Sequence, residues 1–322
     1  MTSLLPRVID LNLDLQQPTY RRSLHTLAVV VALATLPLVF VGGAVTSKNA
    51  GLAVPDWPLS FGQVNPPGWW RVDNVLFEHG HRLLGATVGL LVIALVVWTH
   101  RLERRRWVRR FSLVLLGAVV LQGILGGLRV TEISTKLAVV HGCLAQVFFC
   151  LAGAMACVTS PRWIGQPPAD PSPEAAGVRR ACLVVAAAVF VQLVLGAMLR
   201  HLGWGLLYHI LWALVVLLLT GALAIRLLAD HGQRPLIRRP VHALAGFVVL
   251  QMMAGPMAWF VTQGYSDDRT ATLAEWLLPT LHVALGALAL LSAVATVLGA
   301  FRSLALPWSP GRAVPGAEVQ AL

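Results

Sequence analysis

The stretch LFEHGHRLLGATVGLLVIALVVW, residues 76–98, decides the fold. Its second part, Leu83–Trp98, is an apolar run suited to lipid, but the run begins beside a glutamate, two histidines and an arginine. Ionisable side chains are costly inside a bilayer, and where they occur they usually have a function. The stretch therefore indicates a membrane-spanning helix with a chemical task at its leading end.

Similar apolar runs recur along the whole chain. Its 322 residues are 57% hydrophobic and only 12% charged, with a mean hydropathy of +0.72, whereas soluble domains are about 25% charged. A spanning helix needs roughly 20 mostly apolar residues, and a membrane strand only about 10 alternating ones. The sequence therefore predicts an all-α integral membrane protein with eight transmembrane helices, at about residues 24–45, 80–99, 111–130, 137–158, 180–199, 205–228, 241–262 and 275–301.

Positive charge is divided unevenly between the two sides of these spans. When successive loops are assigned to opposite sides, 18 Lys and Arg residues fall on one side and seven on the other. Positive loops stay in the cytoplasm, so both termini are predicted to be cytoplasmic and the 46–79 loop to lie outside. The seven outer residues are Lys48, Arg71, Arg82, Arg129, Lys136, Arg200 and Arg269. The net charge of +11 is thus a topology signal, and nucleic acid is excluded as a partner.

The chain also repeats itself. Three outward-running spans place a glycine four residues after a glutamine, at Gln122/Gly126, Gln192/Gly196 and Gln251/Gly255. Each returning span carries one histidine near its outer end: His81, His141, His209 and His282. The sequence therefore predicts two pseudo-symmetric four-helix bundles related as a parallel repeat.

This repeat sets the expected organisation of the chain. The predicted segments are a cytoplasmic N-terminal segment 1–23, a first half 24–158, a cytoplasmic linker 159–179, a second half 180–301 and a cytoplasmic tail 302–322. An organelle leader would be rich in Arg and Ser and free of acids. Asp10 and Asp14 interrupt the N-terminal segment, so we expect a bacterial plasma membrane.

The four histidines favour haem binding. Any single one could hydrogen-bond a neighbouring helix, but that role gives no reason for the same depth on all four hairpins. Two imidazoles across a bundle interior suit the two axial positions of a haem iron. A metal-ion cluster would need three or four converging ligands. Two halves with two histidines each therefore predict two porphyrin sites toward the outer face.

Several neighbouring residues could complete these sites. Arg82, Arg129 and Arg200 lie near the outer boundary and are candidates for binding haem propionates, although arginine there can also simply anchor the interface. Glu78 lies three residues before His81 and shares its helix face. It is either a carboxylate favoured by the helix dipole or a catalytic group in the first half alone. His79 is interpreted as a boundary residue.

The outer loop and the cysteines complete the inventory. Residues 46–79 form either an ordered lid on the outer membrane face or a solvated connector. No cysteine pair falls in an outer loop. The cysteines are interpreted as small buried apolar residues: Cys143, Cys150, Cys157 and Cys182.

The motifs, taken in order, resemble the haem A synthase family over essentially all eight helices. They are VTSKNAGLAVPDWPLSFG (45–62), EHGHRLLG (78–85), GGLRV (126–130) and VVHGCLAQ (139–146), together with the repeated histidines. The family is an integral membrane oxidase that converts haem O to haem A by oxidising a ring methyl to a formyl group. Some members carry a cysteine pair in the first outer loop; this chain does not, and resembles the cysteine-lacking type.

The resemblance also implies residue roles. His209 and His282 match the axial ligands of a resident haem b iron, His81 and His141 match the ligands of the substrate haem O, and Glu78 matches a glutamate required for turnover. A haem O synthase and an unidentified electron donor are candidate partners besides haem O and the lipid bilayer. The oligomeric state is open, a homo-oligomer included.

Two other functions fit the spans. A di-haem b-type electron-transfer subunit linked to quinol would use the four histidines but would not need Glu78. A transporter built on parallel repeats would bind no haem. We also leave open whether His79, His201 or the outer arginines contact haem.

Overall fold

The computed structural model of the chain describes residues 19–167, 169, 171–263 and 270–306. Most of the predicted segment 1–23 and of the tail 302–322, together with Arg269, lies outside the described residues. The long helices are α1 (Arg22–Ser47), α2 (Asp73–Leu102), α3 (Arg106–Thr131), α4 (Thr135–Val158), α6 (Ala175–Leu202), α7 (Leu206–His231), α8 (Pro235–Thr262) and α9 (Leu273–Ser303). Two short helices, η2 (Trp69–Arg71) and α5 (Pro161–Ile164), lie in connections.

All eight long helices are long and apolar enough to cross a membrane. The predicted all-α membrane class is thereby confirmed, and the described residues contain the predicted number of spans. Each helix extends past at least one end of the predicted apolar run, because charged residues at the membrane edge continue the helix while interrupting the apolar pattern. In α2 the helix begins at Asp73, so Glu78 and His81 share a helix face.

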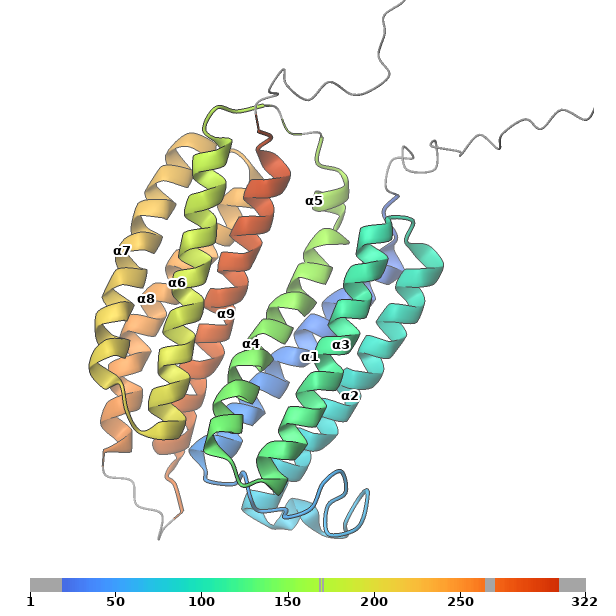
Figure 1. Cartoon of the computed structure of the whole chain (residues 1–322), viewed down its shortest axis with the longest axis vertical. Helices are drawn as coiled ribbons and strands as arrows, with labels where there is room; N and C mark the ends of the chain where they lie inside the picture. Colours follow the sequence, from blue (N-terminus) through green and yellow to red (C-terminus); the bar gives the residue numbers. More distant parts are fainter. Residues whose placement is uncertain (1–18, 168, 170, 264–269, 307–322) are drawn as a thin grey trace, which may run out of the picture.

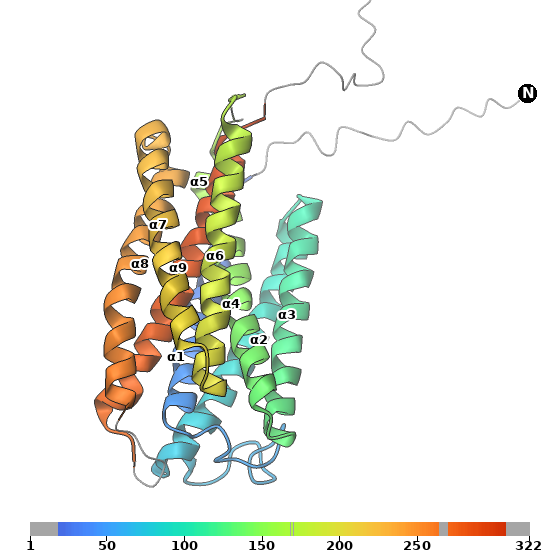
Figure 2. The same cartoon turned by 60° about the vertical axis from the view of Figure 1, so that its left-hand side comes forward.

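The helices form two groups of four (Figure 1). In the first group α1 packs on α2, α2 on α3, α3 on α4 and α4 on α1; in the second, α6, α7, α8 and α9 repeat the same ring of contacts. The two groups meet where α1 contacts α9 and α4 contacts both α6 and α9, as Figure 2 shows from a second side. Exchanging the groups exchanges α1 with α6 and α4 with α9, so this pattern of contacts is consistent with the predicted pseudo-symmetric repeat.

Each group has its own apolar core. Leu95 and Met155 belong to the core of the first group, and Leu227 and Leu244 to that of the second. A smaller cluster of Val39, Phe149 and Ala287 joins α1, α4 and α9 between the groups. The histidine-bearing helices are therefore held on two separately packed bundles.

The turns that start the histidine-bearing helices have local causes. Between α6 and α7 the sequence LGWG needs two glycines, because Gly203 and Gly205 have left-handed backbone angles, φ 71° and φ 95°, which side chains with a Cβ rarely adopt. Ser134 caps α4 by accepting a hydrogen bond from Leu137 N, and Thr272 forms a capping box with Glu275 on α9.

Candidate functional site

The four histidines lie at the same end of the molecule, each within the first third of its helix. Each imidazole packs on a glycine of the preceding helix in its hairpin. A Cβ atom on that glycine would lie 2.9–3.3 Å from the histidine Cε1 atom, a distance tighter than ordinary contact. The pairs are His81 with Gly42, His141 with Gly126, His209 with Gly196, and His282 with Gly255. The glycines thus make room for the four rings.

In the second half the two imidazoles face each other. The ring centroids of His209 and His282 are 6.3 Å apart and the rings are inclined at 79°. Two imidazoles on opposite sides of a metal, each with a metal–nitrogen bond of about 2 Å, would have centres roughly 6 Å apart. The spacing of this pair therefore fits axial ligation of one iron.

The glutamines of the repeat reach these histidines. Gln192 Nε2 donates to the His209 carbonyl at 3.0 Å and lies 3.1 Å from its Nδ1 atom. The Gln122 amide, oriented to satisfy its hydrogen bonds, donates to the His141 carbonyl at 3.3 Å and to Nδ1 at 3.1 Å. Gln251 Nε2 donates to the His282 carbonyl. Glutamine thus pins the turn that carries the histidine to the neighbouring helix.

Glu78 is buried, with 4% of its surface exposed. Its Oε1 accepts from Arg82 Nη2 at 2.8 Å, and its Oε2 accepts from the Val54 N–H at 2.9 Å. The corresponding positions of the other three histidine-bearing helices, three residues before the histidine, are Ala138, Leu206 and Pro279. Among these four positions only that of the first half has a carboxylate.

Two arginines hold the loop of residues 48–72 against the histidine-bearing end of the first half. Figure 1 shows this loop at the lower end of α1 and α2. Arg82 donates to the carbonyls of Val54, Asp56 and Leu59. Arg129 donates to the Gly51 carbonyl at 3.1 Å. The structure therefore favours an ordered lid over a solvated connector for this loop.

A tight turn stiffens the loop further. The N–H groups of Gly62 and Phe61 donate to the Asp56 carboxylate at 2.8 and 2.7 Å. These bonds, that of Gly62 first, lower the Asp56 pKa because they stabilise the ionised form.

The third candidate arginine joins the two halves. Arg200 of α6 donates to the Gly43 carbonyl at 2.7 Å and to Ser47 Oγ at 2.6 Å, both on α1. Ser47 Oγ in turn lies 3.1 Å from Thr280 Oγ1 of α9. All three arginines thus hold backbone carbonyls at the histidine-bearing end of the bundles.

The interpretation of His79 as a boundary residue is wrong. His79 is 2% exposed, lies 2.8 Å from Ser60 Oγ and packs edge-on against Trp69, with ring centroids 4.8 Å apart. Its side chain points to the loop because successive residues of a helix are rotated by about 100°, so His79 and Glu78 point in different directions. His201 lies near Gly142 where α6 meets α4, close enough to His141 and Arg129 to interact with both electrostatically.

Sequence reasoning also missed Gly42 and the loop atoms that receive Glu78 and Arg82. Gly42 lies in a run, VFVGG, without the glutamine that marks the other three glycines. The signal that could have found it is its position in the first outward span, equivalent to Gly196. The loop contacts have no sequence signal, because backbone carbonyls and N–H groups carry no residue identity.

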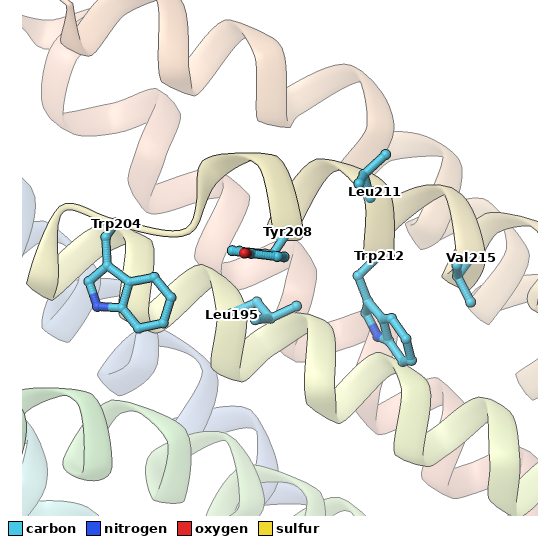
Figure 3. A pocket seen from close by; sticks show the side chains of 6 residues that line it. All are labelled: Leu195, Trp204, Tyr208, Leu211, Trp212 and Val215. Atoms are coloured by element: carbon cyan, nitrogen blue, oxygen red, sulfur yellow. The ribbon is translucent and has the colours of Figure 1, made fainter.

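A separate pocket of about 550 Å³ lies on the α6–α7 hairpin, and Figure 3 shows its apolar and aromatic lining. Its walls are Leu195, Trp204, Tyr208, Leu211, Trp212 and Val215. Trp212 Nε1 donates to the Ala188 carbonyl. The pocket contains none of the four histidines, so it does not form part of the candidate site.

The residues present fit a haem in three respects. The donors are paired imidazoles, the usual protein ligands of six-coordinate haem iron, and glycines leave space beside each ring. The Nδ1 atoms of His81 and His282 are inaccessible to water and bond to no side chain among the described residues. Within the same residues no three His, Cys, Asp or Glu side chains gather as a metal-ion site would require.

Comparison with known proteins finds one family model and several curated relatives. The family model COX15-CtaA, described as cytochrome oxidase assembly protein, matches residues 70–210. A haem A synthase of Exiguobacterium sp. is 25% identical over 73% of this chain and 82% of its own length. That of Allorhizobium ampelinum is 27% identical over 73% of each chain. That of Shouchella clausii is 32% identical, but the match covers only 35% of its length. The chain is thus similar to haem A synthases over almost three quarters of its length, and its residues 70–210 match the cytochrome oxidase assembly family COX15-CtaA.

Proposed function

We propose that this protein is a haem A synthase, which oxidises a ring methyl of haem O to a formyl group. The observation that carries the proposal is the pair of imidazoles 6.3 Å apart in the second half, with its counterpart in the first half beside a buried carboxylate. Bound haem iron supplies the oxygen and electron chemistry. With dioxygen as oxidant the reaction balances, one methyl group and one dioxygen giving one formyl group and one water.

The two halves divide the work in this proposal. His209 and His282 hold a resident haem b, and His81 and His141 hold the substrate haem O. Similarity to haem A synthases and the repeated glycine–histidine contact support this assignment. Arg82, Arg129 and Arg200 are the candidate donors to the haem propionates, because each already presents guanidinium N–H groups at the histidine-bearing end.

Glu78 is the proposed catalytic residue. The protein keeps it buried, fixes one oxygen on Arg82 and the other on the Val54 N–H, and thereby aligns it with the helix face of His81. A positioned carboxylate there can hold or accept a proton as the substrate methyl is oxidised. The lid of residues 48–72 would exclude water from this end of the bundle.

The membrane placement is also part of the proposal. The distribution of Lys and Arg supports a bacterial plasma membrane protein with both termini in the cytoplasm and both haem sites toward the outer face. A haem O synthase as source of the substrate, an external electron donor and a homo-oligomeric assembly are compatible with this placement. The predicted segments 24–158 and 180–301 then correspond to the substrate half and the resident-haem half.

The deciding experiment is Glu78→Gln in cells that make haem O, with extraction and mass analysis of the haems. Glutamine keeps an oxygen for the Val54 N–H, so the loop contact survives while the charge is lost. We expect both haem sites to stay filled and haem A formation to fall about a hundredfold or more, the usual effect of a positioned proton acceptor. A di-haem electron-transfer subunit would not depend on this carboxylate, so haem A formation at the unchanged rate contradicts the catalytic role.

Ser60→Ala is the matched control. It removes the hydroxyl partner of His79 and so loosens the same loop without touching Glu78. We expect this variant to retain haem A formation. An equal loss in both variants would mean that Glu78 acts only by holding the loop.

A further inference from the structure

The glutamine contact is missing from one of the four hairpins. Counting four residues back from the glycine that faces each histidine gives Gln122, Gln192 and Gln251 on α3, α6 and α8. On α1 the same count from Gly42 gives Leu38. His81 is therefore the one histidine of the four whose helix neighbour offers no side-chain amide at this position.

Leu38 occupies the place that a glutamine takes elsewhere. A Cβ atom on Gly286, four residues after His282, would lie 3.4 Å from Gln251 Nε2. A Cβ atom on Gly85, four residues after His81, would lie 4.0 Å from Leu38 Cδ1. The leucine side chain thus packs against the same turn. Its backbone bonds to the His81 ring, but the side chain has no amide and cannot bond the His81 carbonyl.

The amide affects a histidine ligand in two ways. Its bond to the histidine carbonyl fixes the depth and rotation of the turn, and this bond is present for His141, His209 and His282. In two cases, Gln122 and Gln192, the amide also lies 3.1 Å from Nδ1. The atom that approaches is the amide nitrogen, a donor, so the contact holds the imidazole ring in addition to the turn.

The first and second halves differ by a reciprocal exchange at this point. His81 has a carboxylate three residues before it, Glu78, and no glutamine on the neighbouring helix. The equivalent His209 has Leu206 three residues before it and Gln192 on the neighbouring helix. The histidine beside the carboxylate, His81, thus lacks the amide that holds the other histidine of its half, His141. His81 is held instead through Glu78 and Arg82, which bond to the outer loop.

We propose that Leu38 makes His81 the exchangeable axial ligand of the first-half haem, and that Gln122, Gln192 and Gln251 are positioning residues that keep the other three histidines in place. The inference rests on the proposed haem sites. In the substrate half His141 then stays bound to the haem iron while His81 can dissociate. In the second half both His209 and His282 stay bound.

Carbon monoxide binding to the reduced, haem-loaded, full-length protein tests this directly, because carbon monoxide enters only where an axial ligand is displaced. In the wild type we expect one of the two haems to bind it. Leu38→Gln should slow this binding about tenfold, the lower end of the effect of an outer hydrogen-bond partner on a metal ligand. Leu38→Met, which keeps an apolar side chain of similar size, should leave the rate unchanged.

The reverse exchange, Gln192→Leu, gives an independent measurement. It should let carbon monoxide bind the second haem and shift part of the ferric spectrum from low-spin to high-spin. Should Leu38→Gln fail to fold, this variant decides alone. Equal rates in the glutamine and methionine variants, or a second haem that still excludes carbon monoxide in Gln192→Leu, overturn the inference and leave the synthase proposal intact. Wild-type protein without a Soret band would overturn both.

Discussion

At the scale of single residues, the site depends on glycines as much as on histidines. The imidazoles can lie in the bundle because the facing residue on the preceding helix has no side chain. The two closest cases are Gly42 against His81 and Gly196 against His209, each with 2.9 Å between the position of a Cβ and the ring Cε1 atom. A methyl group there would have to displace the ring.

Gly196→Ala is therefore expected to weaken haem binding in the second half. Overpacking of this kind costs about 1–3 kcal/mol, although alanine is otherwise the better helix former. The haem content of purified protein and its melting temperature measure the effect. Gly246→Ala is the control, because a Cβ there meets no atom within 4 Å. Equal haem content in the two variants would show that the Gly196 contact does not position His209.

The residues of the site were partly predictable from sequence. His81, His141, His209 and His282 could be found because the pattern repeats four times. Gly42 was missed because its hairpin lacks the glutamine, and His79 because nothing local indicates that Ser60 and Trp69 fold back onto it. The loop contacts of Glu78 and Arg82 could not be predicted, because they are made to backbone groups that every residue type has.

At the scale of elements, the helices follow from apolar length, while the outer loop follows from a few polar contacts. Its composition, rich in Gly, Pro and Trp, was compatible with either a lid or a connector. The decision lies in Arg82, whose guanidinium bonds three loop carbonyls, and in Asp56, which closes a turn on the N–H groups of Phe61 and Gly62.

The loop should therefore loosen only in acid. Hydrogen bonds lower the Asp56 pKa below its ordinary value of 3.8, so the ionised carboxylate stabilises the turn at any pH above that value. This contribution disappears as the pH falls through the lowered pKa. Hydrogen exchange of the Phe61 and Gly62 amides should show constant protection from neutral pH to about pH 4 and decreasing protection below it.

Asp56→Asn provides the comparison for this titration. Asparagine keeps one acceptor oxygen but does not titrate, so its protection should be lower than that of the wild type and independent of pH in the same range. If wild-type protection already declines above about pH 5, another carboxylate governs the turn.

At the scale of the whole molecule, the two four-helix groups are separate cores joined by few polar contacts. The sequence predicted the two halves from the repeat. It could not predict which helices meet, since a helix surface that faces lipid and one that faces another helix are both apolar. The interface consists of α1, α4, α6 and α9. Arg200 is its main polar link, because it crosses from α6 to Gly43 and Ser47 of α1.

Arg200→Met should therefore weaken the link between the halves as well as any contact with haem. Removing the guanidinium leaves the Gly43 carbonyl and the Ser47 hydroxyl without this donor, at a cost of about 1–3 kcal/mol. Unfolding in increasing dodecyl sulfate, followed by helical circular dichroism of protein prepared without added haem, should show a lower midpoint or two separate transitions. Arg129→Met is the matched variant, because the hydrogen bond of Arg129 within the described part of the chain goes to the Gly51 carbonyl of its own half. Its midpoint should stay close to that of the wild type. Equal midpoints for the two variants would mean that apolar contacts such as Val39 with Phe149 and Ala287 hold the halves together without Arg200.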